Sequence, residues 1–464
     1  MLDRMSGMGG MKLFRSKKVL LEDGLQEAGI LVGQEGKIDR ILRKDELATL
    51  QHNAEVLDVG NLVIMPGLVD SHVHVNEPGR TEWEGYWTAT RAAAAGGVTT
   101  IVDMPLNSIP PTTTKKNLET KMIAAKGKKH VDVAFWGGVV PGNQNELKDM
   151  VEAGVVGFKC FLCPSGVDEF PEVTKEDVEL SLKELEGTNS VLAFHAECEL
   201  GAELVMPSDN PCEYRTFLRS RPPKMEVTAV QLITQLCSKY SVRCHIVHLS
   251  AAEALPFVRA AKSSGLPLTA ETCHQYLTLN AEAIPDCATQ YKCCPPIRGL
   301  QNRERLWAAL VAGELDMVVS DHSPCTPEMK QTRGGKAQFL TAWGGISSLQ
   351  FGLSLFWTEA RKRGFSIADI SRFLSQNPSK LCGLQYAKGQ LKEGMDADLV
   401  IWDPEAKFQV EKSIIQHKHK LTPYLGKWLN GRVIYTILRG QAVYQNGKFS
   451  PPLGRLVLSS ASKH

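Results

Sequence analysis

The chain has 464 residues, a formal net charge of +2 and 43% hydrophobic residues, a balance typical of soluble globular proteins. The near-neutral charge gives no electrostatic basis for binding nucleic acid, and no stretch is apolar enough to span a membrane. Twelve cysteines in so long a chain indicate free thiols in a reducing compartment. We expect a cytoplasmic protein, and note that the terminal Ser-Lys-His is close to the peroxisomal address Ser-Lys-Leu.

Three kinds of segment follow one another along the chain. The first 65 residues contain short runs that alternate apolar and polar residues, namely KKVLLEDG, GILVGQEG and KIDRILRK. Residues 66–384 alternate apolar runs with helix-like stretches such as NELKDMVEAG and TAVQLITQLCSKY. Residues 385–464 return to strand-like runs, including RVIYTILRG and QAVYQNGKF. We therefore predict a central domain at 66–384 and one small β domain formed by 1–65 and 385–464.

The central segment holds eight apolar runs that are candidates for parallel strands. They are NLVIMPGLVDSHVHV, VTTIVDM, VDVAFWGGVV, VVGFKCFL, SVLAFHAE, RCHIVHLS, LPLTAETC and MVVSDH. Eight strands alternating with helices favour a (β/α)8 barrel of the TIM type over a doubly wound open sheet. The sequence has no glycine-rich phosphate fingerprint opening a helix, which also argues against the open sheet.

Side chains able to bind metal stand at the ends of these runs, where a barrel places its active site. His72 and His74 are two residues apart in a strand, so both can face the barrel axis. His195, His248 and Asp321 end later runs. Each of these residues taken alone is more often structural than catalytic. Together, in barrel order, they favour a metal site.

Lys159 is unusual because it lies inside the apolar run VVGFKCFL, and lysine is almost never fully buried unless paired. Its ammonium has no lone pair and cannot bind metal. One interpretation is a lysine whose head reaches water. The other is a neutral lysine carboxylated by CO2, whose two oxygens bridge two cations. The spacing does not decide between them.

The remaining polar residues of these runs have structural interpretations. His245 lies three residues before His248, so in a strand it faces the opposite side. Cys160 and Cys163 form a C-x-x-C pair without a second pair at zinc-finger spacing, which favours free thiols.

The order of these residues resembles the cyclic amidohydrolases, a group that contains dihydroorotases, hydantoinases, dihydropyrimidinases and allantoinases. The resemblance extends from MPGLVDSHVH to LKEGMDADLVIWDP. It implies a (β/α)8 barrel with a small β-sandwich domain from both termini, often in a homotetramer. It also implies two divalent metal ions, for which we expect zinc, although such ligands accept Mn, Co or Fe as well. The implied ligands are His72, His74, carboxylated Lys159, His195, His248 and Asp321.

Within this group, the loop HVHVNEPGRTEWEG and the segments GFKCFL, KCCPPIRG and SDHSPC are most similar to allantoinases. Dihydroorotases have an arginine for a substrate carboxylate at the position of Asn76, whereas Asn76 suits an uncharged ureido group. The resemblance implies hydrolysis of allantoin to allantoate, with Asp321 as general base and then general acid. The expected substrate contacts are Asn76, Asn107, Ser323 and Cys294.

Two other interpretations remain open. The first is that the protein is another cyclic amidase, such as a hydantoinase, dihydropyrimidinase or dihydroorotase. The second is that it is a non-catalytic scaffold related to dihydropyrimidinases. The six intact ligand positions argue against the scaffold. The segment AETCHQYL departs from the usual TCPHY at His274 and Gln275, which affects expected substrate contacts rather than metal ligands. We expect Arg80 to brace Glu82 or Glu84.

Overall fold

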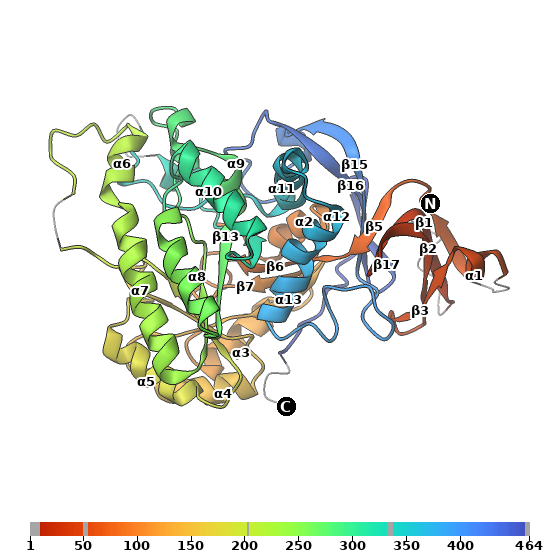
Figure 1. The fold of residues 1–464 in the computed structure, drawn as a ribbon, viewed down its shortest axis with the longest axis horizontal. Helices are drawn as coiled ribbons and strands as arrows, with labels where there is room; N and C mark the ends of the chain where they lie inside the picture. The colour runs from red at the N-terminus through yellow and green to blue at the C-terminus, as the bar shows by residue number, and fades with distance from the viewer. Residues whose placement is uncertain (1–9, 50–53, 202–203, 332–336, 460–464) are drawn as a thin grey trace.

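The computed structural model describes residues 10–49, 54–201, 204–331 and 337–459. Figure 1 shows strands wrapped by helices and, to one side, a sheet that contains the N-terminal strands. The predicted α/β class, a (β/α)8 barrel with a small β-sandwich, is confirmed. No helix of the described residues is long and apolar enough to cross a membrane. The terminal Ser-Lys-His lies outside the described residues.

The eight apolar runs form the barrel strands, and one of them is interrupted at Trp136. The strands are β6 (Leu68–Val73), β7 (Val98–Asp103), β8 (Asp132–Phe135) with β9 (Gly137–Gly138), β10 (Phe158–Phe161), β11 (Val191–His195), β12 (Arg243–Ile246), β13 (Leu268–Cys273) and β14 (Met317–Val319). Their ladders are parallel. The last strand meets the first where the His74 N–H donates to the His322 carbonyl at 2.8 Å. All strands therefore end on one face of the barrel.

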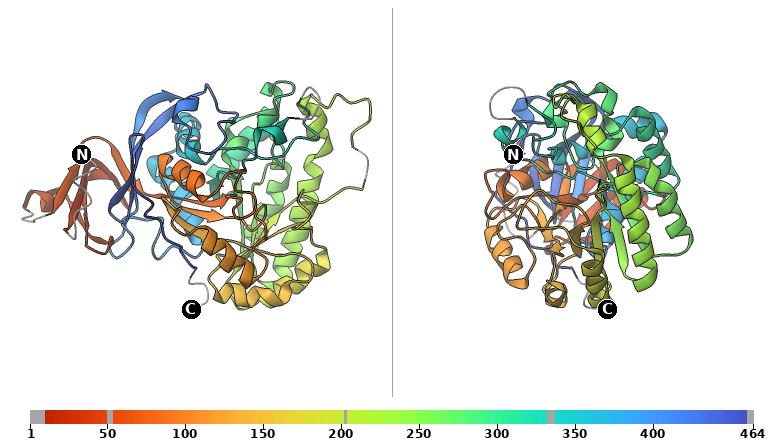
Figure 2. Two further views of the ribbon diagram at one scale, coloured as in Figure 1. Left: turned by 180° about the vertical axis from the view of Figure 1, so that it is seen from behind. Right: turned by 90° about the vertical axis from the view of Figure 1, so that its left-hand side faces the viewer.

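Helices cover the outside of the barrel (Figures 1 and 2). Those in the barrel region are α2 (Tyr86–Ala95), α3 (Lys115–Ala124), α4 (Leu147–Glu152), α5 (Lys175–Leu185), α6 (Tyr214–Ser220), α7 (Pro223–Tyr240), α8 (Leu255–Ser263), α9 (His274–Thr278), α10 (Leu300–Val311), α11 (Gly352–Ala360), α12 (Ile367–Ser371) and α13 (Asn377–Leu381). Helix α2 ends before Gly97, whose φ is 82° and where an added Cβ would lie 2.5 Å from Val400. Only glycine fits this approach of the barrel to the terminal sheet.

Strands from both ends of the chain form one sheet. They are β1 (Lys12–Leu21), β2 (Gly24–Val32), β3 (Ile38–Arg43), β4 (Glu55–Asp58), β5 (Val63–Pro66), β15 (Leu399–Gln409), β16 (Trp428–Leu438), β17 (Gln441–Gln445) and β18 (Lys448–Phe449), with helix α1 (Lys44–Thr49) after β3. The two ends join where β15 pairs antiparallel with β5, so that Ile401 faces Ile64. Both side chains are fully buried in an apolar cluster with Phe14 and Ile30. The boundaries at residues 65 and 384 stay predictions.

A buried ion cluster links the barrel to this sheet. The Lys388 ammonium lies 2.6 Å from carboxylate oxygens of Asp132 and Asp398 and 2.8 Å from Asp396. Asp132 begins β8, whereas Asp398 immediately precedes β15. Arg439 also pairs with Asp132. Because Lys388 is only 2% exposed, its charge is balanced almost entirely by these carboxylates.

Replacing this lysine tests the link. Lys388→Met leaves several carboxylates buried without their shared cation, so we expect it to lower the free energy of unfolding by about 3–5 kcal/mol. Denaturant unfolding measures the loss. Lys392→Met, at an exposed position four residues away, is the matched control and should change little. Equal stability of the two variants would contradict this role for Lys388.

Candidate active site and metal centre

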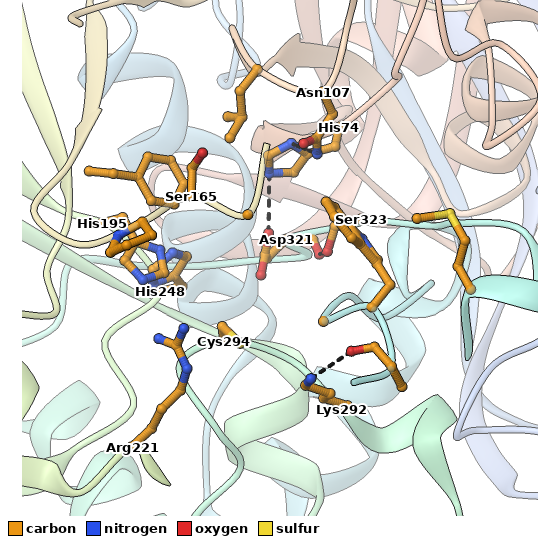
Figure 3. A pocket seen from close by; sticks show the side chains of 18 of the residues that line it. His74, Asn107, Ser165, His195, Arg221, His248, Lys292, Cys294, Asp321 and Ser323 are labelled. Carbon is orange, nitrogen blue, oxygen red and sulfur yellow. Dashed lines mark hydrogen bonds and ion pairs between the residues drawn. The ribbon is translucent and has the colours of Figure 1, made fainter. Parts of the chain in front are cut away.

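A cavity of about 580 Å³ opens at the carboxyl ends of the barrel strands (Figure 3). The predicted residues His74, Lys159, His195, His248 and Asp321 all line it. His72 lies directly behind them and is fully buried. The barrel thus gathers six side chains from distant parts of the sequence around one space.

The first group of candidate ligands is His72, His74 and Asp321. Asp321 Oδ1 lies 3.2 Å from His72 Nε2 and 3.5 Å from His74 Nε2. Burial raises the pKa of Asp321, but the charge of His72 and hydrogen bonds from both histidines hold it well below its usual range. Burial lowers the pKa of His74 to about 3. At neutral pH this group therefore offers an ionised carboxylate and a neutral imidazole, the forms that bind metal.

Lys159 reaches the same place from β10. Its side chain is 1% exposed, and its Nζ lies 3.2 Å from His72 Nε2. Burial lowers the pKa of this lysine to about 8, although Asp321 and Glu271 partly oppose the shift. The ammonium can therefore lose its proton near neutral pH, which is the chemical requirement for reaction of the amine with an electrophile.

His195 and His248 form the other side of the group. Their ring centroids lie 4.6 Å apart, and His248 lies 5.4 Å from His72. The His195 ring stacks on Phe161 at 4.5 Å. His195 Nε2 bonds Glu197 Oε2 at 2.7 Å, which leaves its Nδ1 free to bind another group. His248 Nδ1 is buried and has no partner among the described residues.

Glu271, which the sequence interpretation missed, positions several of these residues. Its Oε1 accepts from His72 Nδ1 at 2.5 Å and from the His248 backbone N–H at 3.2 Å, while Oε2 accepts from His245 Nε2 at 3.1 Å. Burial raises its pKa, but His72 and His245 lower it to about 2. The ionised carboxylate holds the Nδ1 proton of His72, so Nε2 is the ring nitrogen that faces Lys159 and Asp321 and would bind a metal after losing its own proton. The signal was a glutamate inside the apolar run LPLTAETC.

The donor set fits metal ions. Imidazole nitrogens and a carboxylate are suitable ligands for divalent transition metals, and one atom each from His72, His74 and Asp321 lie within 4.8 Å of one another. Two further such groups occur among the described residues, but each already holds a protein cation. Lys388 lies among Asp132, Asp396 and Asp398. In the group of Cys163, His195 and Glu197, Arg221 is bonded to Glu197.

Three of the four predicted substrate contacts line the cavity, and the fourth does not. Asn107, Ser323 and Cys294 line the cavity. Asn107 bonds His74 Nδ1 through Nδ2 at 3.2 Å, and the Ser323 hydroxyl donates to the Asp321 carbonyl at 3.0 Å. Asn76 is buried, does not line the cavity, and donates from Nδ2 to the Pro324 carbonyl at 3.2 Å.

The expected brace of Arg80 against Glu82 or Glu84 is wrong. Arg80 instead pairs with Glu169 and donates to the Asn107 carbonyl at 2.9 Å. Glu84 accepts from the Lys418 backbone N–H, so its carboxylate is already engaged by the C-terminal part of the chain.

The unusual pair His274 and Gln275 begins helix α9. Both residues are buried, and neither lines the cavity. None of the twelve cysteines, all of which lie in the described residues, forms a disulfide.

Comparison with protein families matches residues 63–443 to the amidohydrolase family. Among curated proteins, the chain is 56% identical to the mitochondrial allantoinase of Aquarana catesbeiana over 84% of this chain and 79% of that protein. It is 47% identical to the allantoinase of Streptomyces avermitilis over 96% of this chain and 98% of that protein.

Solved structures of similar proteins include the L-hydantoinase of Arthrobacter aurescens, with a TM-score of 0.88 and 28% identity over 97% of this chain and all of that one. The dihydropyrimidinase of Brevibacillus agri has a TM-score of 0.87 and 26% identity over 97% of this chain and 99% of that one.

Glu271→Gln tests the proposed control of ligand geometry. The amide is neutral and has one acceptor oxygen in place of two, so it holds His72, His245 and His248 less firmly, and we expect metal affinity to fall about 10–100-fold. Competition with a chelator measures the affinity. Glu253→Gln, at a side chain 45% exposed and paired with Arg305, is the control. Unchanged metal affinity in Glu271→Gln would show that this carboxylate does not position the ligands.

Proposed function

The chain belongs to the amidohydrolase family, and we propose that within it the protein is an allantoinase, which hydrolyses the ring of allantoin to allantoate. The observation that carries the substrate assignment is the 47–56% identity to curated allantoinases. The site supports the same chemistry, because it combines metal-ligand side chains with an ionised carboxylate at one end of a barrel.

We propose that His72, His74, carboxylated Lys159, His195, His248 and Asp321 hold two divalent ions, zinc in the first instance. Such ions, when bound, polarise an amide carbonyl and lower the pKa of water from 15.7 to about 7. The pKa of about 8 for Lys159 supports its carboxylation. The neutral amine forms a C–N bond to CO2 and releases one proton, which gives a carbamate with two oxygen ligands.

Asp321 performs the proton transfers. Its carboxylate, ionised at neutral pH, accepts a proton from the attacking water and then gives it to the ring nitrogen as the C–N bond breaks. The backbone of Asp321 is left-handed, with φ of 42°. The Ser323 hydroxyl donates to the Asp321 carbonyl and so helps to hold this conformation. Asp321 is therefore general base and then general acid.

Asn107, Ser323 and Cys294 are the proposed substrate contacts on the cavity wall. Asn76 is retained as a fourth because its buried Oδ1 has no partner among the described residues. A homotetramer, a role in purine degradation and a cytoplasmic or peroxisomal location are further proposals that come from the resemblance and the tail sequence.

The second candidate function is hydantoinase or dihydropyrimidinase, which the TM-scores of 0.87–0.88 favour. Those structures are only 26–28% identical to this chain, however, so they support the fold more strongly than the substrate.

Allantoate formation from allantoin, measured with metal content on the same purified sample, tests the proposal. We expect turnover with about two metal ions per chain, and none on dihydroorotate or dihydrouracil. Metal-replete protein that is inert on allantoin would indicate that the substrate is another cyclic amide. Protein without metal or turnover, even after incubation with metal and bicarbonate, would favour the scaffold interpretation.

Lys159→Ala removes the proposed carbamate. We expect loss of bound metal and of turnover, because the bridging oxygens are gone, and partial recovery with short carboxylic acids that supply similar oxygens. Metal analysis and allantoin turnover measure both effects. Lys148→Ala, at an exposed lysine of α4, is the control. A fully active, metal-replete Lys159→Ala protein would rule out the carbamate.

A further inference from the structure

Arg221 lines the cavity near His195, to which it is joined through their shared partner Glu197, and the sequence interpretation gave it no role. We propose that its guanidinium binds the ureido carbonyl of allantoin and so selects this substrate over hydantoins that lack the ureido group. This inference rests on the proposed allantoinase function and names the part of the same site that sets its specificity.

The position of Arg221 comes from the loop between α6 and α7. Its side chain is 24% exposed, and one terminal nitrogen donates to Glu197 Oε2 at 2.6 Å. Figure 3 shows the guanidinium directed toward His248. The bond to Glu197, which is fully buried, fixes the head of an otherwise flexible side chain in this direction.

Arg221 retains hydrogen-bond donors after this bond. A guanidinium has five N–H donors, and its other neighbours, Cys163 and Cys294, offer sulfur atoms that are weak acceptors. Lys292, another cation of the lining, donates instead to the carbonyls of Leu340 and Ala342, at 3.1 and 2.5 Å. Arg221 thus keeps more donors for a substrate group than Lys292 does.

The chemistry of allantoin matches these donors. The reacting ring amide must lie at Asp321, which leaves the ureido group to reach another part of the wall. Its carbonyl oxygen has two lone pairs and can accept two N–H groups of one guanidinium that converge on it. The cavity lining also includes Trp343, whose buried Nε1 has no acceptor among the described residues. A ligand rich in carbonyl oxygens therefore suits this cavity.

A different role would be purely structural. Glu197 Oε2 accepts from both Arg221 and His195 Nε2, so a purely structural Arg221 would act by orienting His195. If that were its only role, its removal would weaken metal binding and would affect every cyclic amide equally. Substrate selectivity and metal content therefore separate the two roles.

The test compares wild type, Arg221→Gln and Arg221→Lys as metal-loaded full-length proteins. The measurements are kcat/KM for allantoin, the competitive inhibition constant of hydantoin, and metal content. Loss of a charged hydrogen bond of about 1.5–3 kcal/mol corresponds to a fall of about 10–150-fold. We expect Arg221→Gln to lose this much kcat/KM on allantoin, with the hydantoin constant and metal content nearly unchanged. Arg221→Lys keeps the charge without the fork, so its kcat/KM for allantoin should lie between those of wild type and Arg221→Gln.

Arg219→Gln is the matched control, because Arg219 lies two residues away, is 53% exposed and pairs with Asp209. It should resemble wild type. The inference is overturned if Arg221→Gln keeps its allantoin kcat/KM, or if hydantoin binding and metal content fall in parallel with it. Failure of the wild-type protein to hydrolyse allantoin would instead overturn the proposed function, so the two failures are distinguishable.

Discussion

The ionised carboxylate of Glu271, buried at the centre of the barrel, is the group on which the geometry of the site depends. It accepts hydrogen bonds from His72, from His245 and from the backbone of His248. A buried charge is tolerated only when such partners satisfy it. In return, Glu271 holds the Nδ1 proton of His72, and so orients the ring with Nε2 toward the shared space. Strands β6 and β12 and the segment that follows β12 are thereby tied to one anion on β13.

Closure of the barrel is the second requirement. His72 lies near the end of the first strand and His74 just after it, whereas Asp321 follows the last strand. These strands meet only when the ring closes at His322. His248 and Asp321 also adopt left-handed backbone, with φ of 41° and 42°. Such conformations cost of order 1–3 kcal/mol each and persist when surrounding contacts fix them. The site is therefore a property of the complete barrel rather than of any local segment.

Local patterns in the sequence predicted much of this arrangement. Period-two spacing placed His72 and His74 on one face, and the eight apolar runs each became a barrel strand, because both signals depend only on neighbouring residues. Arg221 and the partner of Arg80 were not predictable in this way. Arg221 reaches the cavity from a loop between helices, and Arg80 meets Glu169 rather than its neighbours Glu82 and Glu84. Such contacts depend on how distant loops meet above the barrel.

The proposed binuclear centre is the claim on which the function depends, and a crystal structure of the zinc-loaded, bicarbonate-treated protein tests it most directly. Anomalous scattering should reveal two ions, one beside His72, His74 and Asp321 and the other beside His195 and His248, with carbamate density on Lys159 Nζ between them. A single ion, or an unmodified Lys159 amine beside two ions, would contradict the account.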